Sequence, residues 1–102
     1  MDRVIQDGKV AVLVSPGFGA GWYSWAHDES MLFDPGLVQL ILNDANFDEK
    51  LGYVSTKWSD VYMGGLEGLE VRWVPVGTEF MIDEYDGSES IVYKEHNDWI
   101  KA

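Results

Sequence analysis

The sequence has 102 residues, the length of one domain, and we expect a single domain over residues 1–102. Its 46% hydrophobic and 14% aromatic residues exclude an intrinsically disordered chain, and the absence of cysteine excludes disulfides and thiolate metal sites. A net charge of −11 disfavours binding to nucleic acid or to anionic lipid and favours a partner with a basic surface.

We expect no targeting signal in the first residues. MDRVIQDGKV lacks the basic and then apolar pattern of a signal peptide, and no apolar run in the chain reaches the roughly 20 residues that span a bilayer. We therefore expect a cytoplasmic protein. The acidic charge has a second interpretation, which is that it only keeps the protein soluble and monomeric.

The first predicted element is a buried strand. KVAVLVS, from Lys9 to Ser15, is a continuous apolar run rich in valine. Asp7-Gly8 before it is a turn signal, which predicts a hairpin with a short strand in RVIQ.

An unusual segment follows, SPGFGAGWYSW, which we call the Gly-aromatic loop (residues 15–25). It opens a long connection, residues 16–33, and such connections are often functional. Its glycines allow another backbone or a ligand to approach closely. The pattern does not fit GxGxxG, because G-F-G-A-G-W lacks the remaining features of a dinucleotide site. We expect a partly exposed aromatic platform; the alternative is that these aromatic rings plug one end of the sheet.

A helix is predicted in DPGLVQLILNDA, with Asp34 as N-cap and Pro35 at the first helical position. A second helix is predicted from Asn46, which can cap it, with Glu49 completing a capping-box pattern. Its apolar stripe is expected to continue to a stop at Gly64-Gly65 through Leu51, Val54, Trp58 and Val61 or Tyr62.

The last part of the chain has strand periodicity. LEVRWVPV, TEFMIDEY and ESIVYKE are separated by the turn signals Gly77-Thr78 and Asp86-Gly87, which predicts an antiparallel meander. With the valine-rich strand beside them, the expected fold class is α+β: an antiparallel sheet of four to five strands with two helices packed on one face.

Motifs for catalysis and metal binding are weak. Ser24, His27 and Asp28 lie close together, but no GxSxG motif accompanies them, and only two histidines exist for a metal site. DEYDGSE has the oxygens of a calcium loop without its spacing, and a hairpin explains it better. We expect no enzymatic activity, no metal and no cofactor.

The segments KVAVLVSPGFGAGWYSW, GLEVRWVPVGTEF and EYDGSES resemble small acidic, largely uncharacterised accessory proteins of tailed bacteriophages. The resemblance covers most of the chain and implies a protein that acts in the host bacterial cytoplasm. Such proteins commonly disable or divert host machinery, including anti-phage defence, by binding a host protein or by sequestering a nucleotide signal.

Two binding hypotheses follow. In the first, a non-catalytic phage-type protein inhibits or diverts a host component through its acidic surface and the Gly-aromatic loop, and Asp44, Asp48 and Glu49 are further candidates for that surface. In the second, the loop sequesters a nucleotide-like ligand, whose phosphates meet Arg72 and backbone N–H groups. The net charge favours the protein partner. The expected binding residues are Phe18, Gly19, Gly21, Trp22, Tyr23, Trp25, Arg72, Asp83, Glu84, Asp86 and Glu89.

Overall fold

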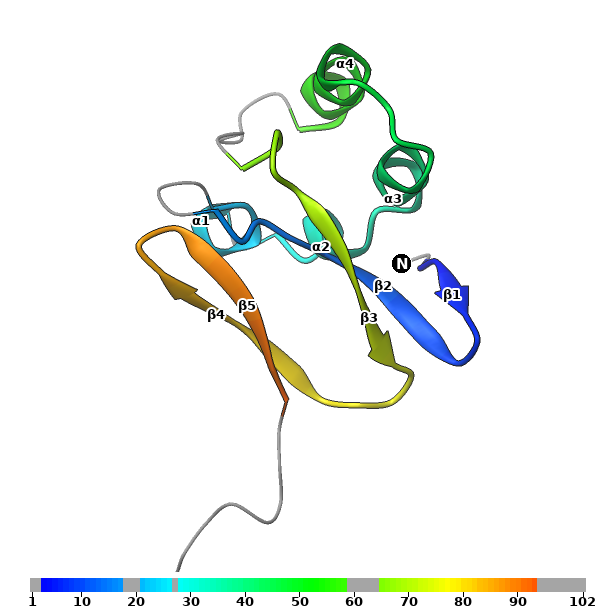
Figure 1. Ribbon diagram of the computed structural model, residues 1–102, viewed down its shortest axis with the longest axis vertical. Helices are drawn as coiled ribbons and strands as arrows, with labels where there is room; N and C mark the ends of the chain where they lie inside the picture. The colour runs from blue at the N-terminus through cyan, green and yellow to red at the C-terminus, as the bar shows by residue number, and fades with distance from the viewer. Residues whose placement is uncertain (1–2, 18–20, 27, 59–64, 94–102) are drawn as a thin grey trace, which may run out of the picture.

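The chain folds around the valine-rich segment, which forms strand β2 (Lys9–Val14) as expected. The computed structural model describes residues 3–17, 21–26, 28–58 and 65–93, and they form an α+β fold (Figure 1). β2 pairs antiparallel with β1 (Ile5–Gln6) on one side and with β3 (Glu70–Pro75) on the other. The predicted hairpin between β1 and β2 is confirmed. Asp7 and Gly8 have φ values of 51° and 75° at the turn, the left-handed conformation that a two-residue hairpin requires.

Both faces of β2 are buried. Ala11 and Leu13 enter one hydrophobic cluster, whereas Val10, Val12 and Val14 enter a second. Side chains alternate between the two faces of a strand, so the clusters lie on opposite sides of the sheet. A strand covered on both faces reads as a continuous apolar run, which explains the sequence of this segment.

Two predicted helices are present with their predicted N-caps. In α3 (Pro35–Leu42), the Asp34 carboxylate accepts the Leu37 N–H at 2.9 Å. In α4 (Phe47–Lys57), the Asn46 side chain accepts the Glu49 N–H, also at 2.9 Å. Both helices contribute to the first cluster, and α4 packs against α3.

The predicted end of the second helix is wrong. α4 ends at Lys57, and Trp58 leaves the helical conformation with φ −132° and ψ 68°. Trp58 is 8% exposed, so the departure from the helix accompanies burial of its ring in the first cluster. The predicted continuation through Val61 and Tyr62, and the Gly64 half of the stop signal, lie outside the described residues.

The connection before α3 contains two short helices that the sequence did not predict, α1 (Tyr23–Ala26) and α2 (Ser30–Phe33). Met31 of α2 is buried in the first cluster, while Leu32 and Phe33 are buried in the second. The end of this connection is therefore part of the core.

The predicted meander is only partly correct. β4 (Phe80–Tyr85) and β5 (Ser88–Tyr93) form the expected hairpin around Asp86 and Gly87, which have φ values of 51° and 84°. However, β3 pairs with β2, and the described strands form a three-stranded sheet and a separate two-stranded sheet instead of one sheet of four to five strands.

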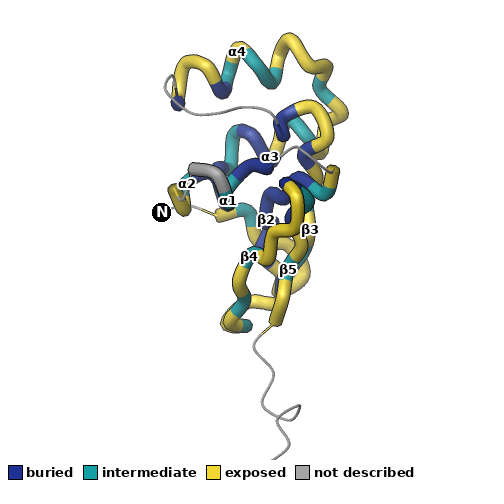
Figure 2. Tube along the Cα trace, turned by 90° about the vertical axis from the view of Figure 1, so that its left-hand side faces the viewer, coloured by how far each residue is buried: buried dark blue, intermediate teal, exposed yellow. Residues whose placement is uncertain are grey.

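Burial explains the division into two sheets. The valines on the second face of β2 need cover, and the hairpin supplies it with Phe80, Ile82 and Ile91. Figure 2 shows the result: buried positions gather around β2 and α3, whereas exposed positions dominate the hairpin. The three-stranded sheet thus has α3 and α4 on one side and the hairpin on the other, and α2 contributes side chains to both clusters.

Candidate binding surface

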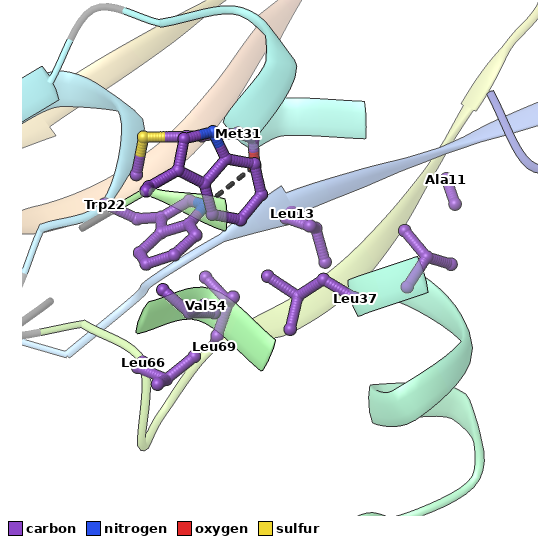
Figure 3. Close-up of a cluster of buried hydrophobic side chains, with 10 residues drawn as sticks. Ala11, Leu13, Trp22, Met31, Leu37, Val54, Leu66 and Leu69 are labelled. Carbon is purple, nitrogen blue, oxygen red and sulfur yellow. Dashed lines mark hydrogen bonds between the residues drawn. The ribbon is translucent and has the colours of Figure 1, made fainter. Parts of the chain in front are cut away.

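Trp22, expected on an exposed platform, is a core residue. Its side chain is fully buried in the first cluster, and its Nε1–H donates to the Met31 carbonyl oxygen at 2.7 Å (Figure 3). Its ring meets Trp58 edge to face, with centroids 6.0 Å apart. The prediction of exposure is wrong for this residue, because the buried indole has both an apolar environment and a partner for its N–H.

The other predicted residues of the Gly-aromatic loop give a mixed result. Tyr23 is half-buried and packs against both clusters. Trp25 lies in α1, but its side chain lies outside the described part of the structure, as do Phe18 and Gly19. Gly21 is buried with φ 96°, so the left-handed conformation requires glycine there.

Gly21 packs against another part of the protein's own backbone. A Cβ added at Gly65 would lie 2.3 Å from the Gly21 carbonyl oxygen and 2.7 Å from the Ser15 Oγ. The close approach that glycine permits is therefore made between residues 21 and 65 of this chain. Of the two interpretations of the loop, the structure supports a core plug at Trp22 and Gly21.

Glu89 is the residue that holds the loop in place. It was expected on the acidic surface, but it is 2% exposed, so that expectation is wrong. Its Oε1 accepts the Ser15 N–H at 2.9 Å, and its Oε2 accepts the Trp22 N–H at 2.9 Å and the Ser24 N–H at 2.8 Å. The Ser24 hydroxyl adds a fourth hydrogen bond, at 2.6 Å to Oε2.

These contacts explain why an acidic residue is buried. The backbone N–H groups of Trp22 and Ser24 lie at the start of α1, and the carboxylate caps this short helix from a distant strand. The Glu89 N–H also donates to the Ser15 carbonyl at 2.8 Å, and the Ser88 hydroxyl donates to the Pro16 carbonyl at 2.7 Å. The start of β5 is thus bonded to the loop by main chain and side chains together.

Arg72, the cation proposed for phosphate binding, lies exposed on β3. Its guanidinium donates to the carboxylate of Glu70, two residues earlier on the same strand. A local acidic side chain therefore already neutralises this guanidinium.

The remaining predicted acidic residues are exposed and form two groups. Asp83, Glu84 and Asp86 lie on the β4–β5 hairpin. Asp44, Asp48 and Glu49 lie at the connection from α3 to α4 and in the first turn of α4. Figures 1 and 2 show α4 and the hairpin as separate parts of the molecule, so these are two separate acidic surfaces.

The apolar part of the hairpin surface was not predicted from the sequence. Met81, Tyr85 and Val92 are 62%, 77% and 43% exposed. They lie on the face opposite to Phe80, Ile82 and Ile91, as strand alternation and the pairing of Met81 with Val92 require. The alternating pattern of TEFMIDEY indicates that the strand has two different faces, but it does not indicate which face packs against the core.

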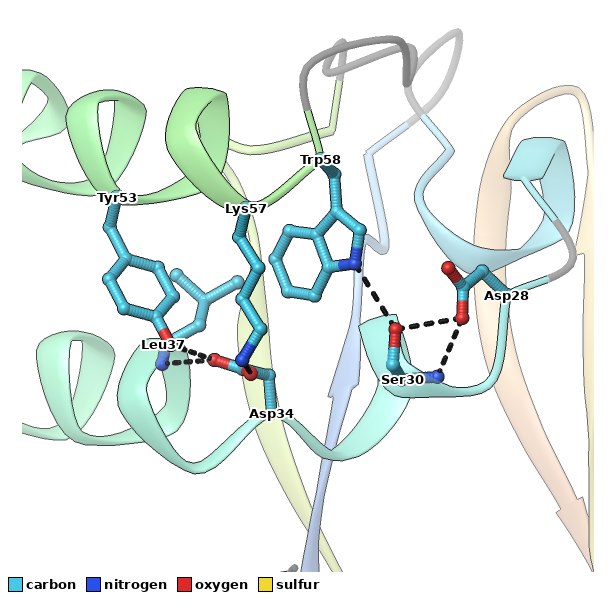
Figure 4. A network of polar contacts seen from close by, with 7 residues as sticks. All are labelled: Asp28, Ser30, Asp34, Leu37, Tyr53, Lys57 and Trp58. Atoms are coloured by element: carbon cyan, nitrogen blue, oxygen red, sulfur yellow. Dashed lines mark hydrogen bonds and ion pairs between the residues drawn. The ribbon is translucent and has the colours of Figure 1, made fainter. Parts of the chain in front are cut away.

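A second buried carboxylate, Asp34, joins α3 to α4 (Figure 4). Asp34 is 3% exposed, and besides capping α3 it accepts the Tyr53 hydroxyl at 2.6 Å and pairs with the Lys57 ammonium. The sequence predicted only the N-cap, because the two partners lie 19 and 23 positions later in the chain, on another helix.

The pKa values of this group are coupled. Burial raises the pKa of Asp34, but the hydrogen bonds from Lys57, Tyr53 and the Leu37 N–H outweigh it and hold the pKa below its ordinary value. The hydrogen bond to Asp34 raises the pKa of Lys57, and burial together with the same carboxylate raises the pKa of Tyr53. All three shifts favour the ion pair that ties the helices together.

The residues considered for a catalytic triad have structural contacts instead. The Ser24 hydroxyl donates to Glu89, and the Asp28 carboxylate accepts the Ser30 hydroxyl at 2.7 Å. Ser30 Oγ in turn accepts the Trp58 Nε1–H at 3.1 Å (Figure 4). His27 and His96 lie outside the described residues.

The described part of the chain contains neither a metal-ligand cluster nor a membrane-spanning helix. No group of three or more acidic or histidine side chains there is arranged to hold a metal ion. No helix among those residues combines the length and the apolar character needed to cross a membrane. Comparison of the chain with protein families, with curated proteins and with solved structures gives no match.

Proposed function

We propose that this protein is a non-catalytic binding protein that uses an acidic surface to occupy a basic site on another protein. In line with the resemblance to phage accessory proteins, the proposed partner is a host component, such as part of an anti-phage defence system, in the bacterial cytoplasm. Binding there would inhibit the partner or divert it.

The observation that carries this proposal is the composition of the β4–β5 hairpin. The segment from Glu79 to Tyr93 contains five acidic residues and no lysine, arginine or histidine. Only Glu89 is turned into the core; Asp83, Glu84 and Asp86 are exposed beside large apolar side chains. Clustered negative charge steers association with a basic surface and fixes the orientation of the partners.

The second hypothesis, a nucleotide-like ligand in the Gly-aromatic loop, has less support. The N–H groups of Ser15, Trp22 and Ser24 are the anion-binding donors that such a site would need, and Glu89 already accepts all three. Trp22 is buried and cannot stack on a base, and Arg72 is paired with Glu70. The protein's own carboxylate occupies the position that a phosphate would take.

The experiment is a pull-down from host lysate with two matched triple variants. In the first, Asp83→Asn, Glu84→Gln and Asp86→Asn remove three charges from the hairpin. In the second, Asp44→Asn, Asp48→Asn and Glu49→Gln remove three charges from the α3–α4 surface. The two variants make the same chemical changes, two Asp→Asn and one Glu→Gln. Each also changes one residue with positive φ, Asp44 or Asp86, and asparagine tolerates that conformation.

We expect the partner to be captured by the native protein and by the α3–α4 variant, and several-fold less by the hairpin variant. Capture should also fall as salt is raised from about 0.1 M to about 1 M, because the screening length falls from about 10 Å to about 3 Å. Capture that neither triple variant nor salt changes would contradict the proposal. A nucleotide that the native protein retains through purification and that Arg72→Ala loses would support the alternative.

A further inference from the structure

The outward face of the β4–β5 hairpin combines exposed apolar and acidic side chains. Met81 pairs directly with Val92, and Asp83 and Tyr85 follow Met81 on the same face of β4. The three apolar side chains are 62%, 43% and 77% exposed for Met81, Val92 and Tyr85. We define these four residues as the outward face.

Rotation of the hairpin cannot bury these side chains. Its other face is committed to the core, where Phe80, Ile82 and Ile91 pack against the second cluster. Glu89 fixes the hairpin further through its hydrogen bonds to the Gly-aromatic loop. A sheet face with large apolar side chains is stabilised when another layer covers it, and no described element of the chain covers this one. We take that layer to come from a partner.

Charge identifies the kind of partner. Asp83 lies between Met81 and Tyr85 on the outward face, and Asp86 is exposed in the turn that follows Tyr85. A second copy of this chain would bring like charges together in an interface between two molecules of net charge −11. An anionic membrane is disfavoured for the same reason. The complementary surface has apolar side chains flanked by lysine or arginine.

The length and width of the outward face fit an α-helix of the partner. Met81 and Tyr85 are four residues apart on β4, which is about 14 Å at the rise of an antiparallel strand. About nine residues of α-helix span this length, enough for apolar side chains at positions i, i+4 and i+7. A helix about 10 Å wide also covers both strands, whose axes are about 4.8 Å apart.

We propose that the outward face binds an amphipathic helix of the partner protein, with an apolar stripe against Met81, Tyr85 and Val92 and basic residues against Asp83 and its acidic neighbours. This inference rests on the proposed function, because it takes the partner to be a basic protein. It adds the surface used and the element recognised.

The test is an NMR titration of the full ¹⁵N-labelled chain with synthetic peptides. The first probe is a leucine–lysine peptide of about 14 residues with its leucines on one helical face. The second has the same composition with the leucines distributed around the helix. We expect the first to bind about tenfold more tightly, with the largest amide shift changes in β4 and β5.

Two matched substitutions localise the contact. Val92→Ser removes an apolar side chain from the outward face, and Val76→Ser makes the same change at a 55% exposed valine outside it. Val92→Ser should raise the Kd of the first peptide several-fold, and Val76→Ser less than about twofold. Adding Met81→Ser to Val92→Ser should bring the increase to about tenfold. Retained amide dispersion in each variant shows that the fold is intact.

Each other outcome overturns the inference. Equal binding of both peptides, or shift changes centred on the α3–α4 surface, would show that charge alone is recognised, and the proposed function would stand. Tighter binding of an extended peptide of alternating valine and lysine would show that the hairpin recognises a strand. No binding of any basic peptide at about 50 mM salt, where screening is weak, would overturn the proposed function as well.

Discussion

The carboxylate of Glu89 and the backbone N–H of Trp22 are joined by a 2.9 Å hydrogen bond across 67 positions of the chain. Through this bond the last strand holds the residue whose ring fills the core. The loop that we expected to be a binding platform is therefore fixed by the hairpin that carries the proposed binding surface.

Replacing Glu89 tests this relationship. Glu89→Gln keeps the shape but places an amide N–H₂ against N–H donors that now meet a carboxylate oxygen. We expect the free energy of unfolding to fall by about 2 kcal/mol or more, measured by urea denaturation. Glu67→Gln, at an exposed glutamate, should leave stability unchanged within about 0.5 kcal/mol. Equal effects of the two substitutions would contradict the assignment.

We expect Trp22 to stabilise the fold and not to contact a partner. Trp22→Ala removes a fully buried side chain and should cost about 3–5 kcal/mol, visible in thermal or urea unfolding. Tyr85→Ala, at a 77% exposed aromatic residue, should change stability by less than about 1 kcal/mol. If Trp22→Ala instead left stability intact, Trp22 would belong to the exposed platform predicted from the sequence.

The Asp34 carboxylate should make the free energy of unfolding depend on pH. Because the pKa of Asp34 is lower in the folded protein than its ordinary 3.8, its stabilisation is present above pH 3.8 and is lost as the pH falls through the folded value. Asp34→Asn should be less stable than the native protein by about 2 kcal/mol at neutral pH. The difference should shrink in urea unfolding below pH 3.8; a constant difference would show that the charge of Asp34 contributes nothing.

Lys57 predicts a loss of stability at alkaline pH, because its pKa is shifted in the opposite direction to that of Asp34. The pKa of Lys57 is raised above 10.5, so its contribution is complete below pH 10.5 and is lost as the pH rises through the higher folded value. Lys57→Met keeps the apolar stem without the charge. Its stability relative to the native protein should therefore recover above pH 10.5, which urea unfolding at pH 9 and about pH 11 can measure. Parallel curves for the two proteins would argue against the ion pair.

Two glycines in helices provide a matched pair. A Cβ at Gly36 would lie 2.2 Å from the Tyr53 hydroxyl oxygen, which is bonded to Asp34, whereas a Cβ at Gly52 meets nothing within 4 Å. Gly52→Ala should therefore stabilise the protein by about 0.5–1 kcal/mol through helix propensity. Gly36→Ala should displace Tyr53 and destabilise it, as read from melting temperatures. A similar gain for both would mean that the Tyr53 contact is dispensable.

Local chemistry was readable from the sequence. The caps at Asp34 and Asn46, the two-residue turns at Asp7-Gly8 and Asp86-Gly87, and the buried strand from Lys9 were all predicted and are confirmed. Each of these features depends on interactions within a few residues, so the local sequence is enough to predict it. The exposed acidic groups were also predicted correctly, apart from Glu89.

Long-range choices were decided only by tertiary structure. An acidic residue such as Glu89 is ordinarily exposed, and nothing in DEYDGSE indicates that three N–H groups from a distant loop converge on it. Likewise, the sequence did not indicate that the hairpin would fold across the second face of β2 instead of extending the sheet beside β3. Both outcomes follow from one requirement, that β2 be covered on both faces, and that requirement is met by the whole chain and by no local segment.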